Sequence, residues 1–163
     1  MRTAICPGSF DPITLGHLNI IVRAAQIFDR VVVCVAANAT KTSPMFTVEE
    51  KVEMVRRVIA PYPNVTVEVN RGLLAEFARQ YEGSVLIKGL RAASDFDYEF
   101  QMDLINKRIN PELETMFLTA DQRYTFLSSS IVREMARYGA DLHGLVPDEL
   151  IGFIEEKARM RRE

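Results

Sequence analysis

TAICPGSFDPITLGH, residues 3–17, is the stretch that decides the fold of this chain. It begins with a short apolar run at 3–6 and continues through a turn that holds two prolines and two glycines. The helical pattern that follows has its apolar residues on one face: Leu18, Ile21, Val22, Ala25 and Phe28. An apolar strand, a rigid turn and an amphipathic helix in this order predict the first part of a βαβ unit.

The same alternation continues along the rest of the chain. Further apolar runs, separated by helical segments, lie at 31–37, 65–69, 84–87 and 115–120. Two of the five runs are rich in β-branched residues and almost entirely apolar, as expected for strands covered on both faces of a parallel sheet. With right-handed crossovers, these elements predict an α/β fold with a doubly wound five-stranded parallel sheet of the Rossmann-like type.

Helix signals complete the predicted architecture. Thr47 with Glu50 three residues later forms a capping box that marks a helix start. Two C-terminal helices are predicted over 128–138 and 147–161, the second with proline in its first turn. Because no linker, repeat or low-complexity stretch interrupts the pattern, we expect one domain over residues 1–163.

Composition limits the classes of protein to which this chain could belong. Its 163 residues are 48% hydrophobic, enough for a real core, and the formal net charge of −2 argues against a nucleic-acid binder. No run approaches the ~20 apolar residues of a membrane span. Cys6 and Cys34 each lie within an apolar run, which predicts buried free thiols and a cytoplasmic, reducing location.

Polar residues follow most of the predicted strands, at the edge where ligands bind in open α/β sheets. The loops after the first, second, fourth and fifth strands carry the candidates: Gly8, Ser9, Asp11 and His17; Asn38, Thr40 and Lys41; Lys88, Gly89 and Arg91; Asp121, Arg123, Ser128, Ser129 and Ser130. Three of these loops bring cations to one edge of a slightly acidic protein. That arrangement predicts a pocket for a small polyphosphate.

The opening turn has a physical interpretation at this edge. Gly8 allows a tight turn after the strand, Pro12 stiffens the loop, and Gly16 leaves space beside the exposed amides of a helix start. The helix dipole disfavours a charged imidazolium, so we expect His17 to be a neutral donor to a phosphate oxygen. If His17 stood alone, we would expect an exposed histidine without a functional role. The cations predicted at the same edge favour a role for His17 in binding a phosphate.

The other candidates each have a plain structural alternative. The serines at 128–130 could form a second anion site, although serine alone more often serves as a helix cap. Lys41 could be a solvated loop residue, and Glu99 could belong to a wet helix face. Lys88 directly follows an apolar run, so a bound anion or a carboxylate partner is expected, and its nearness to Arg91 favours phosphate recognition.

Several common types of site are absent from the sequence. Neither the P-loop pattern nor G-x-G-x-x-G occurs, which argues against P-loop kinases and classical dinucleotide dehydrogenases. No cluster of residues has metal-ligand spacing, and neither cysteine has a base nearby in sequence. We therefore expect neither a protein-held metal nor a thiol nucleophile.

Motifs spread over the whole chain resemble those of one enzyme family. GSFDPITLGH and FLSSSIVRE resemble the two signatures of the H-x-G-H-type nucleotidyltransferases. Together with ATKTSPMFTVEEK, LIKGLRAASDFDYEFQM and the length, they resemble the phosphopantetheine adenylyltransferase family. The resemblance implies reversible transfer of an adenylyl group from ATP, its Mg²⁺ bound through the ATP phosphates, to 4′-phosphopantetheine, giving dephospho-coenzyme A and pyrophosphate.

The resemblance also implies roles for individual residues. Ser9, Lys41, Leu74 and Lys88 would bind phosphopantetheine, and His17 would stabilise the transition state. From their charge, we expect Lys41 and Arg91 to act with His17 as catalytic residues. The ATP-binding set would be Ser9, Phe10, His17, Gly89, Leu90, Arg91, Glu99, Tyr124, Thr125, Phe126, Leu127, Ser128, Ser129 and Ser130. Many relatives have threonine at position 9, arginine at 88 and, in some members, tryptophan within 122–126, where this chain has serine, lysine and QRYTF.

The resemblance further implies a homohexamer and coenzyme A as a feedback ligand. The helix near 95–110, with apolar residues on two sides, agrees with a subunit contact. Two alternatives remain at this point: a nucleotidyltransferase acting on nicotinamide mononucleotide or a sugar-alcohol phosphate, and a nucleotide-binding regulatory module without turnover.

Overall fold

A computed structural model describes residues 1–37 and 43–161. The strands are β1 (Thr3–Gly8), β2 (Arg30–Ala36), β3 (Val65–Asn70), β4 (Val85–Leu90) and β5 (Glu114–Thr119). The helices are α1 (Leu15–Ile27), α2 (Val48–Ile59), α3 (Leu74–Ala78), α4 (Ala93–Ile109), α5 (Ser129–Arg137) and α6 (Asp148–Met160), with a 3₁₀ turn η1 (Gln122–Tyr124).

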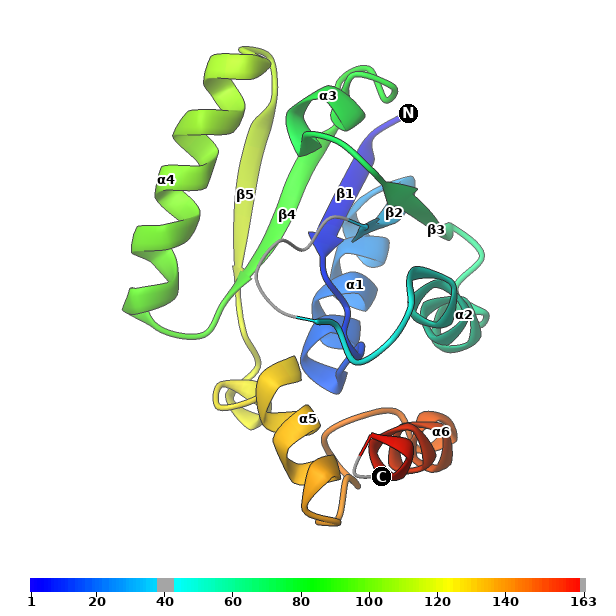
Figure 1. Ribbon diagram of the computed structural model, residues 1–163. Helices are drawn as coiled ribbons and strands as arrows, with labels where there is room; N and C mark the ends of the chain where they lie inside the picture. The colour runs from blue at the N-terminus through cyan, green and yellow to red at the C-terminus, as the bar shows by residue number, and fades with distance from the viewer. Residues whose placement is uncertain (38–42, 162–163) are drawn as a thin grey trace.

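The strands form a parallel sheet in the order β3-β2-β1-β4-β5 (Figure 1). This order confirms the doubly wound α/β prediction. The chain moves outward from β1 through β2 to β3, then returns to the other side of β1 to add β4 and β5. The order therefore reverses between β1 and β4, and a crevice opens at the carboxyl ends of these two strands.

The strand run predicted at 84–87 is longer in the structure than in the sequence interpretation. β4 continues through Lys88, Gly89 and Leu90, which pair with Phe117, Leu118 and Thr119 of β5. A parallel neighbour supplies ladder hydrogen bonds to polar and apolar residues alike, so the strand does not stop where the apolar run ends. Lys88 consequently lies within the last residues of a strand rather than in the loop after it.

Alternate residues of the strands feed two hydrophobic clusters on opposite faces of the sheet. The larger cluster joins Val31, Val33 and Val35 of β2 to helices α1, α2, α5 and α6. The smaller one joins Val32 and Cys34 to α3 and the end of α4. Both cysteines are buried and free, as predicted.

Helices α5 and α6 lie beyond the carboxyl end of β1, so they close the end of the molecule where ligands are expected (Figure 1). The Leu15 N–H donates to the Leu145 carbonyl at 2.8 Å, which ties the start of α1 to the segment between α5 and α6. The predicted helix start is confirmed at Thr47, whose hydroxyl accepts from the Glu50 N–H. Gly139, with φ 71°, follows α5 in the left-handed conformation that often ends a helix.

Helix α4 is only lightly covered. Asn106 is its one buried residue, whereas Phe96, Tyr98 and Phe100 are 43 to 61% exposed. Phe96 stacks on Phe100 and contacts the edge of Phe117 in β5, with ring centroids 5.6 and 5.8 Å apart. The predicted second apolar side therefore exists on the surface of the chain.

Candidate functional site

A cavity of about 330 Å³ lies at the carboxyl ends of β1 and β4, where the strand order reverses. This volume is at the lower end of the range for small-molecule sites. Its lining includes ten of the residues that the sequence predicts as site residues: Phe10, His17, Lys88, Gly89, Arg91, Glu99, Tyr124, Leu127, Ser128 and Ser129. Residues from four separate segments of the chain thus share one cavity.

His17 occupies the third position of α1 and is held by the residue that caps this helix. The Thr14 N–H donates to His17 Nδ1 at 3.0 Å, and the Thr14 hydroxyl accepts from the His17 N–H at 3.3 Å. These two bonds form a capping box with histidine in place of the usual glutamate. Because Nδ1 accepts, the proton of the neutral ring is on Nε2, which is left as the free donor.

The charge state of His17 agrees with the sequence prediction, although the main cause differs. Burial, with a smaller contribution from the Arg91 guanidinium, lowers the pKa of His17 to about 4. The ring is therefore neutral at pH 7, as predicted from the helix dipole. A neutral imidazole with its proton on Nε2 can donate one hydrogen bond to an anion without accepting a proton from solvent.

Phe10 forms a wall beside the histidine. It has φ 48°, so the left-handed turn falls on Phe10, where we expected Gly8 to provide the tight turn. The Phe10 ring is 3% exposed and meets the His17 ring edge-on, with centroids 5.1 Å apart. A Cβ on Gly8 would lie 3.0 Å from the Phe10 ring, so Gly8 makes room for this ring.

Lys88 points toward a carboxylate of helix α4. Its Nζ lies 2.9 Å from Glu99 Oε2, and both side chains are less than one-fifth exposed. The sequence predicted either a bound anion or a carboxylate as the partner of Lys88, and among the described residues the partner is the carboxylate of Glu99. Glu99 therefore lines the cavity and does not belong to a solvated helix face, which was the alternative left open by the sequence.

Arg91 is also held by protein groups. Its Nε and Nη2 donate to the two carboxylate oxygens of Asp95 at 3.1 and 3.2 Å, and its Nη1 donates to the Leu127 carbonyl at 2.9 Å. The hydrogen bonds from Arg91 lower the pKa of Asp95. Since a guanidinium has five N–H groups, Arg91 keeps two for a ligand while its orientation is fixed.

The expected excess of cations is therefore smaller than the sequence suggested. Lys88 is balanced by Glu99 and Arg91 by Asp95. Arg123 binds Asp121 at 3.0 Å, lies over the Tyr124 ring, and is absent from the described lining of the cavity. An anionic ligand must then compete with carboxylates for the two cations of the described lining.

The three serines at the start of α5 have three different roles. Ser128 Oγ accepts from the Ile131 N–H, so the plain cap interpretation fits this residue. Ser129 Oγ donates to the Pro12 carbonyl at 2.8 Å, and Ser130 Oγ accepts from Arg133. Ser128 and Ser129 line the cavity, whereas Ser130 is absent from its described lining.

Asp11 and Arg133 are structural determinants of the site that the sequence interpretation did not assign. The Asp11 side chain is buried, and its two oxygens accept the Met45 and Phe46 N–H groups at 3.0 and 2.9 Å. Arg133 Nη1 donates to the Asp11 carbonyl at 2.6 Å. These bonds join the loop after β1 to α5 and to the segment before α2. The only signals in the sequence were the position of Asp11 after a strand and of Arg133 within FLSSSIVRE.

The remaining predicted site residues lie outside the described lining of this cavity. Ser9 is exposed, Leu74 packs against the smaller hydrophobic cluster, and Phe126 is 57% exposed. Leu90 is the last residue of β4, and the Thr125 hydroxyl donates to the Gln122 carbonyl. Lys41 falls outside the residues that the structure describes.

The donor groups bear on how a metal could bind. Within residues 1–37 and 43–161, no group of three His, Cys, Asp or Glu side chains has the arrangement of a metal site. The two carboxylates in the described lining, Asp95 and Glu99, are already paired with cations. This donor set fits Mg²⁺ arriving on nucleotide phosphates, because Mg²⁺ retains waters and often binds through substrate phosphates.

Two further expectations concern the thiols and the membrane. Burial raises the pKa of both Cys6 and Cys34 to about 12, so neither is a thiolate nucleophile at neutral pH. In the part of the chain that the structure describes, no helix combines the length and the apolar character that a membrane span requires.

Comparisons with known proteins identify the family of this chain. The model of the cytidylyltransferase-like family matches residues 5–135. The phosphopantetheine adenylyltransferase of Desulforudis audaxviator is 50% identical over all of this chain and 99% of that protein. That of Moorella thermoacetica is 54% identical over 92% of this chain and 93% of its own length.

A solved structure from Vibrio parahaemolyticus, named for nicotinate-nucleotide adenylyltransferase activity, superposes with a TM-score of 0.73. The match covers 99% of this chain and 96% of that one, at 16% sequence identity. At this identity the likeness supports the fold alone.

Proposed function

This chain belongs to the cytidylyltransferase-like family and, within it, to the phosphopantetheine adenylyltransferases, and on that premise we propose that it transfers the adenylyl group of ATP to 4′-phosphopantetheine. The observation that carries this proposal is the meeting of His17, Lys88 and Arg91 in one cavity. They come from separate segments, at the point where the strand order reverses. The whole of residues 1–163 would act as one nucleotidyltransferase domain.

The reaction needs alignment more than acid–base chemistry. A phosphate oxygen of 4′-phosphopantetheine attacks the α-phosphorus of ATP, a new P–O bond forms, and the bond from the α-phosphorus to the bridging oxygen breaks. Pyrophosphate leaves with the electron pair of that bond, and dephospho-coenzyme A results. Because a phosphate monoester is largely ionised at pH 7, no general base is required. The cavity correspondingly offers a neutral donor and cations.

His17 has the properties of a transition-state donor. Its Nε2–H is free because Thr14 occupies Nδ1, and its low pKa keeps the ring neutral at the pH of the reaction. A hydrogen bond from Nε2 to an oxygen of the α-phosphate would strengthen as negative charge builds there. Such a preorganised donor contributes on the order of 3 kcal/mol to the lowering of the barrier.

The cations would bind the reacting phosphates. Lys88, with Ser9, Lys41 and Leu74, is assigned to phosphopantetheine, and its present partner Glu99 holds the ammonium in the cavity until a phosphate takes it over. Arg91 is assigned to the nucleotide, since Asp95 and Leu127 fix its plane and leave two N–H groups free. The ATP-binding role proposed for residues 124–130 is supported by the members of that segment that line the cavity: Tyr124, Leu127, Ser128 and Ser129.

Mg²⁺ would enter as part of the ATP substrate. When bound to the phosphates, it supplies charge neutralisation of the pyrophosphate leaving group. The carboxylates of Asp95 and Glu99 are already paired with Arg91 and Lys88. Their part is to position these cations.

Pyrophosphate release tests the proposed function. ATP and Mg²⁺ are supplied with 4′-phosphopantetheine, with nicotinamide mononucleotide, or with neither. We expect release only with 4′-phosphopantetheine. Faster release with nicotinamide mononucleotide would identify a different nucleotidyltransferase, and ATP binding without release in any mixture would indicate a regulatory module.

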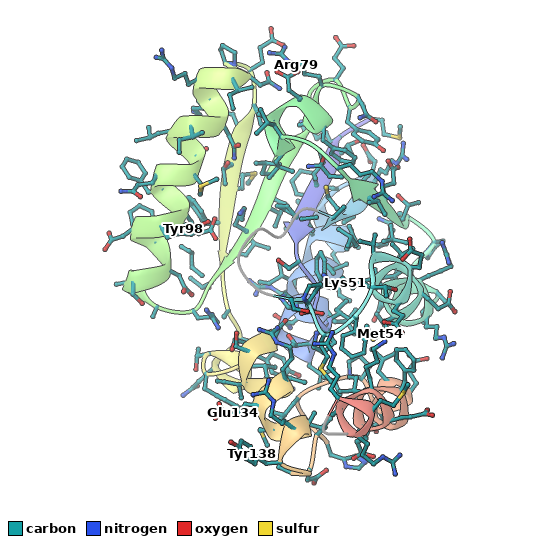
Figure 2. The ribbon with its side chains drawn as sticks, in the orientation of Figure 1. Lys51, Met54, Arg79, Tyr98, Glu134 and Tyr138 are labelled. Carbon is teal, nitrogen blue, oxygen red and sulfur yellow. The ribbon has the colours of Figure 1, made fainter. Side chains whose placement is uncertain are left out.

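Assembly, location and feedback belong to the same proposal. We expect a cytoplasmic homohexamer that is inhibited by coenzyme A. The exposed aromatic and aliphatic side chains of α4, including Tyr98 (Figure 2), would support the assembly, because their burial between subunits stabilises an oligomer. Light scattering after size exclusion should give a mass of about six chains, and a monomeric mass would contradict this assembly.

A further inference from the structure

A second cavity, of about 400 Å³, lies between α5, α6 and the segment before α2. Its described lining contains three arginines, Arg133, Arg137 and Arg161, together with Ser43, Met45 and Ala158. We propose that this cavity is a separate binding site for an organic phosphate monoester. The proposal does not depend on the reaction assigned to the first cavity.

Two of the three arginines are held in place by backbone carbonyls. Arg133 Nη1 donates to the Asp11 carbonyl, and Arg161 Nη2 donates to the Pro44 carbonyl. A carbonyl orients a guanidinium without neutralising it, so Arg161 keeps its full charge, while the charge of Arg133 is offset only by a long contact with the Asp11 carboxylate. The guanidinium groups are therefore preorganised, which lowers the entropic cost of binding an anion.

Arg137 has no such partner. It lies one helical turn after Arg133 on α5, its side chain is exposed, and within the described residues it makes no hydrogen bond or ion pair. Like charges four residues apart repel each other and destabilise a helix. An anion between the two guanidinium groups would remove this repulsion.

The charges around the cavity indicate the class of ligand. The Asp11 carboxylate lies 3.6 Å from Arg133, while Glu50, which also feels the charge of Arg161, is paired with Lys157 at 2.7 Å. Among the described residues, one carboxylate against three guanidinium groups leaves an excess of two positive charges. A phosphate monoester carries about −1.5 to −2 at pH 7, whereas a diester or a sulfate ester carries only about −1.

The volume of the cavity indicates the size of the ligand. About 400 Å³ lies within the range of sites for small organic molecules, and a single phosphate group would fill only a part of it. Met45 and Ala158 provide apolar surface next to the arginines. The ligand is accordingly an organic molecule with a terminal phosphate.

The second cavity is separate from the first, although the two share a wall. Their described linings have no residue in common. The loop after β1 lies between them, held by Ser129 through Pro12 and by Arg133 through Asp11. Ser129, Arg133 and Arg137 follow one another at intervals of four along α5, so one helix face serves both cavities.

Calorimetric titration of the full chain with phenyl phosphate and phenyl sulfate tests the proposal. The two probes have the same shape and differ in charge. We expect phenyl phosphate to bind at least about tenfold more tightly than phenyl sulfate, and Arg137→Ala to weaken phenyl phosphate binding by about tenfold, since a charge-assisted bond is lost.

Two control variants locate the binding event. Arg159→Ala removes an exposed arginine of α6 that does not line the cavity, and His17→Ala alters the first cavity. Both should bind phenyl phosphate like the unmodified chain. Equal binding by Arg137→Ala and Arg159→Ala, or loss of binding in His17→Ala alone, would overturn the proposal. Equal affinity for the two probes would overturn the assignment to a phosphate monoester. Unchanged pyrophosphate release by Arg137→Ala would show that this variant is folded.

Discussion

The two cavities of this protein hold their cations in different ways. In the first, Lys88 and Arg91 are paired with Glu99 and Asp95, and His17 is neutral. In the second, Arg133 and Arg161 are bound by carbonyls, and Arg137 makes no contact of this kind within the described residues. A carboxylate neutralises a cation while it orients it, whereas a carbonyl only orients it.

This difference has a consequence for binding. In the first cavity a phosphate has to replace a carboxylate, so an ion pair is exchanged and the net gain is moderate. Moderate binding of reactants suits a cavity that must also release products. Among the described residues of the second cavity, no ion pair has to break except the long contact between Arg133 and Asp11, so the positive charge of the arginines attracts an anion directly. The first arrangement suits turnover and the second suits retention.

His17→Ala should have the largest effect, because it removes the neutral Nε2 donor to which we assign stabilisation of the transition state. We expect kcat to fall by about 10²–10³ with little change in KM for either substrate. Steady-state pyrophosphate release measures both constants. His143→Ala is the matched control, since this histidine is exposed and lies outside both described linings. Unchanged turnover in His17→Ala would remove the role assigned to this residue.

Asp11→Asn tests the wall that the two cavities share. An amide keeps one acceptor oxygen and places an NH₂ group against a backbone N–H, so one of the two bonds to Met45 and Phe46 is lost. We expect the free energy of unfolding to fall by about 2 kcal/mol, measured by urea denaturation. Asp29→Asn, in which one exposed bond to the Arg2 N–H is weakened, should cost less than about 0.5 kcal/mol. Equal losses would mean that Asp11 does not anchor the wall.

Lys88→Ala addresses the exchange of ion pairs in the first cavity. Removal of the ammonium should raise KM for 4′-phosphopantetheine by about tenfold, because a charge-assisted bond to its phosphate is lost. Lys88→Arg keeps the charge, matches many relatives and should stay within a few-fold of the unmodified enzyme. If alanine and arginine have the same effect, the charge at this position is not what binds the phosphate.

The pKa values of the two histidines, His17 and His143, test how far burial and neighbouring charges differ between their surroundings. This is the smallest of the expected effects. Burial lowers the pKa of His17 to about 4, whereas the hydrogen bond that the His143 ring donates to the Asp141 carboxylate raises the pKa of His143 above 6.5. NMR titration should therefore show His143 protonated at pH 6 and His17 neutral down to about pH 5, with its proton on Nε2. A His17 ring that titrates near pH 6.5 would contradict its burial and its bond to Thr14.

The same pKa changes act on stability in opposite directions. Between pH 6.5 and 4 the unfolded chain binds a proton at His17 that the folded chain does not, so this group lowers stability as the pH falls through that range. His143 has a raised pKa, so the stability it contributes is present below pH 6.5 and is lost as the pH rises through its folded-state value. Urea midpoints of His143→Ala at pH 5 and 8 separate the two effects.

Much of the fold could be predicted because its signals are local. Apolar runs and helix periodicity placed the strands, and Thr47 with Glu50 placed the start of α2. The convergence of His17, Lys88 and Arg91 was predicted as well, since the carboxyl ends of parallel strands share one edge. The extension of β4 through Lys88 was missed, because the ladder to β5 depends on a neighbour that is distant in sequence.

The partners of the charged residues could not be predicted. Lys88 and Glu99 are eleven positions apart, and only the packing of α4 beside β4 decides that they meet. Asp11 was visible as a polar residue after a strand, but its bonds to Met45 and Phe46 span more than thirty residues. The sequence also contains Arg133, Arg137 and Arg161 without any pattern that links them.

By itself, the sequence determined the elements of this protein and their alternation, and it predicted several of the polar residues that meet in the first cavity, because periodicity, caps and residue chemistry act over a few positions. Only the tertiary structure decided that the strand order reverses between β1 and β4 and that the loop after β1 separates two cavities. It also decided which cations are neutralised by carboxylates and which remain charged. These properties depend on distances between atoms far apart along the chain, and electrostatic interactions are set by such distances and by burial.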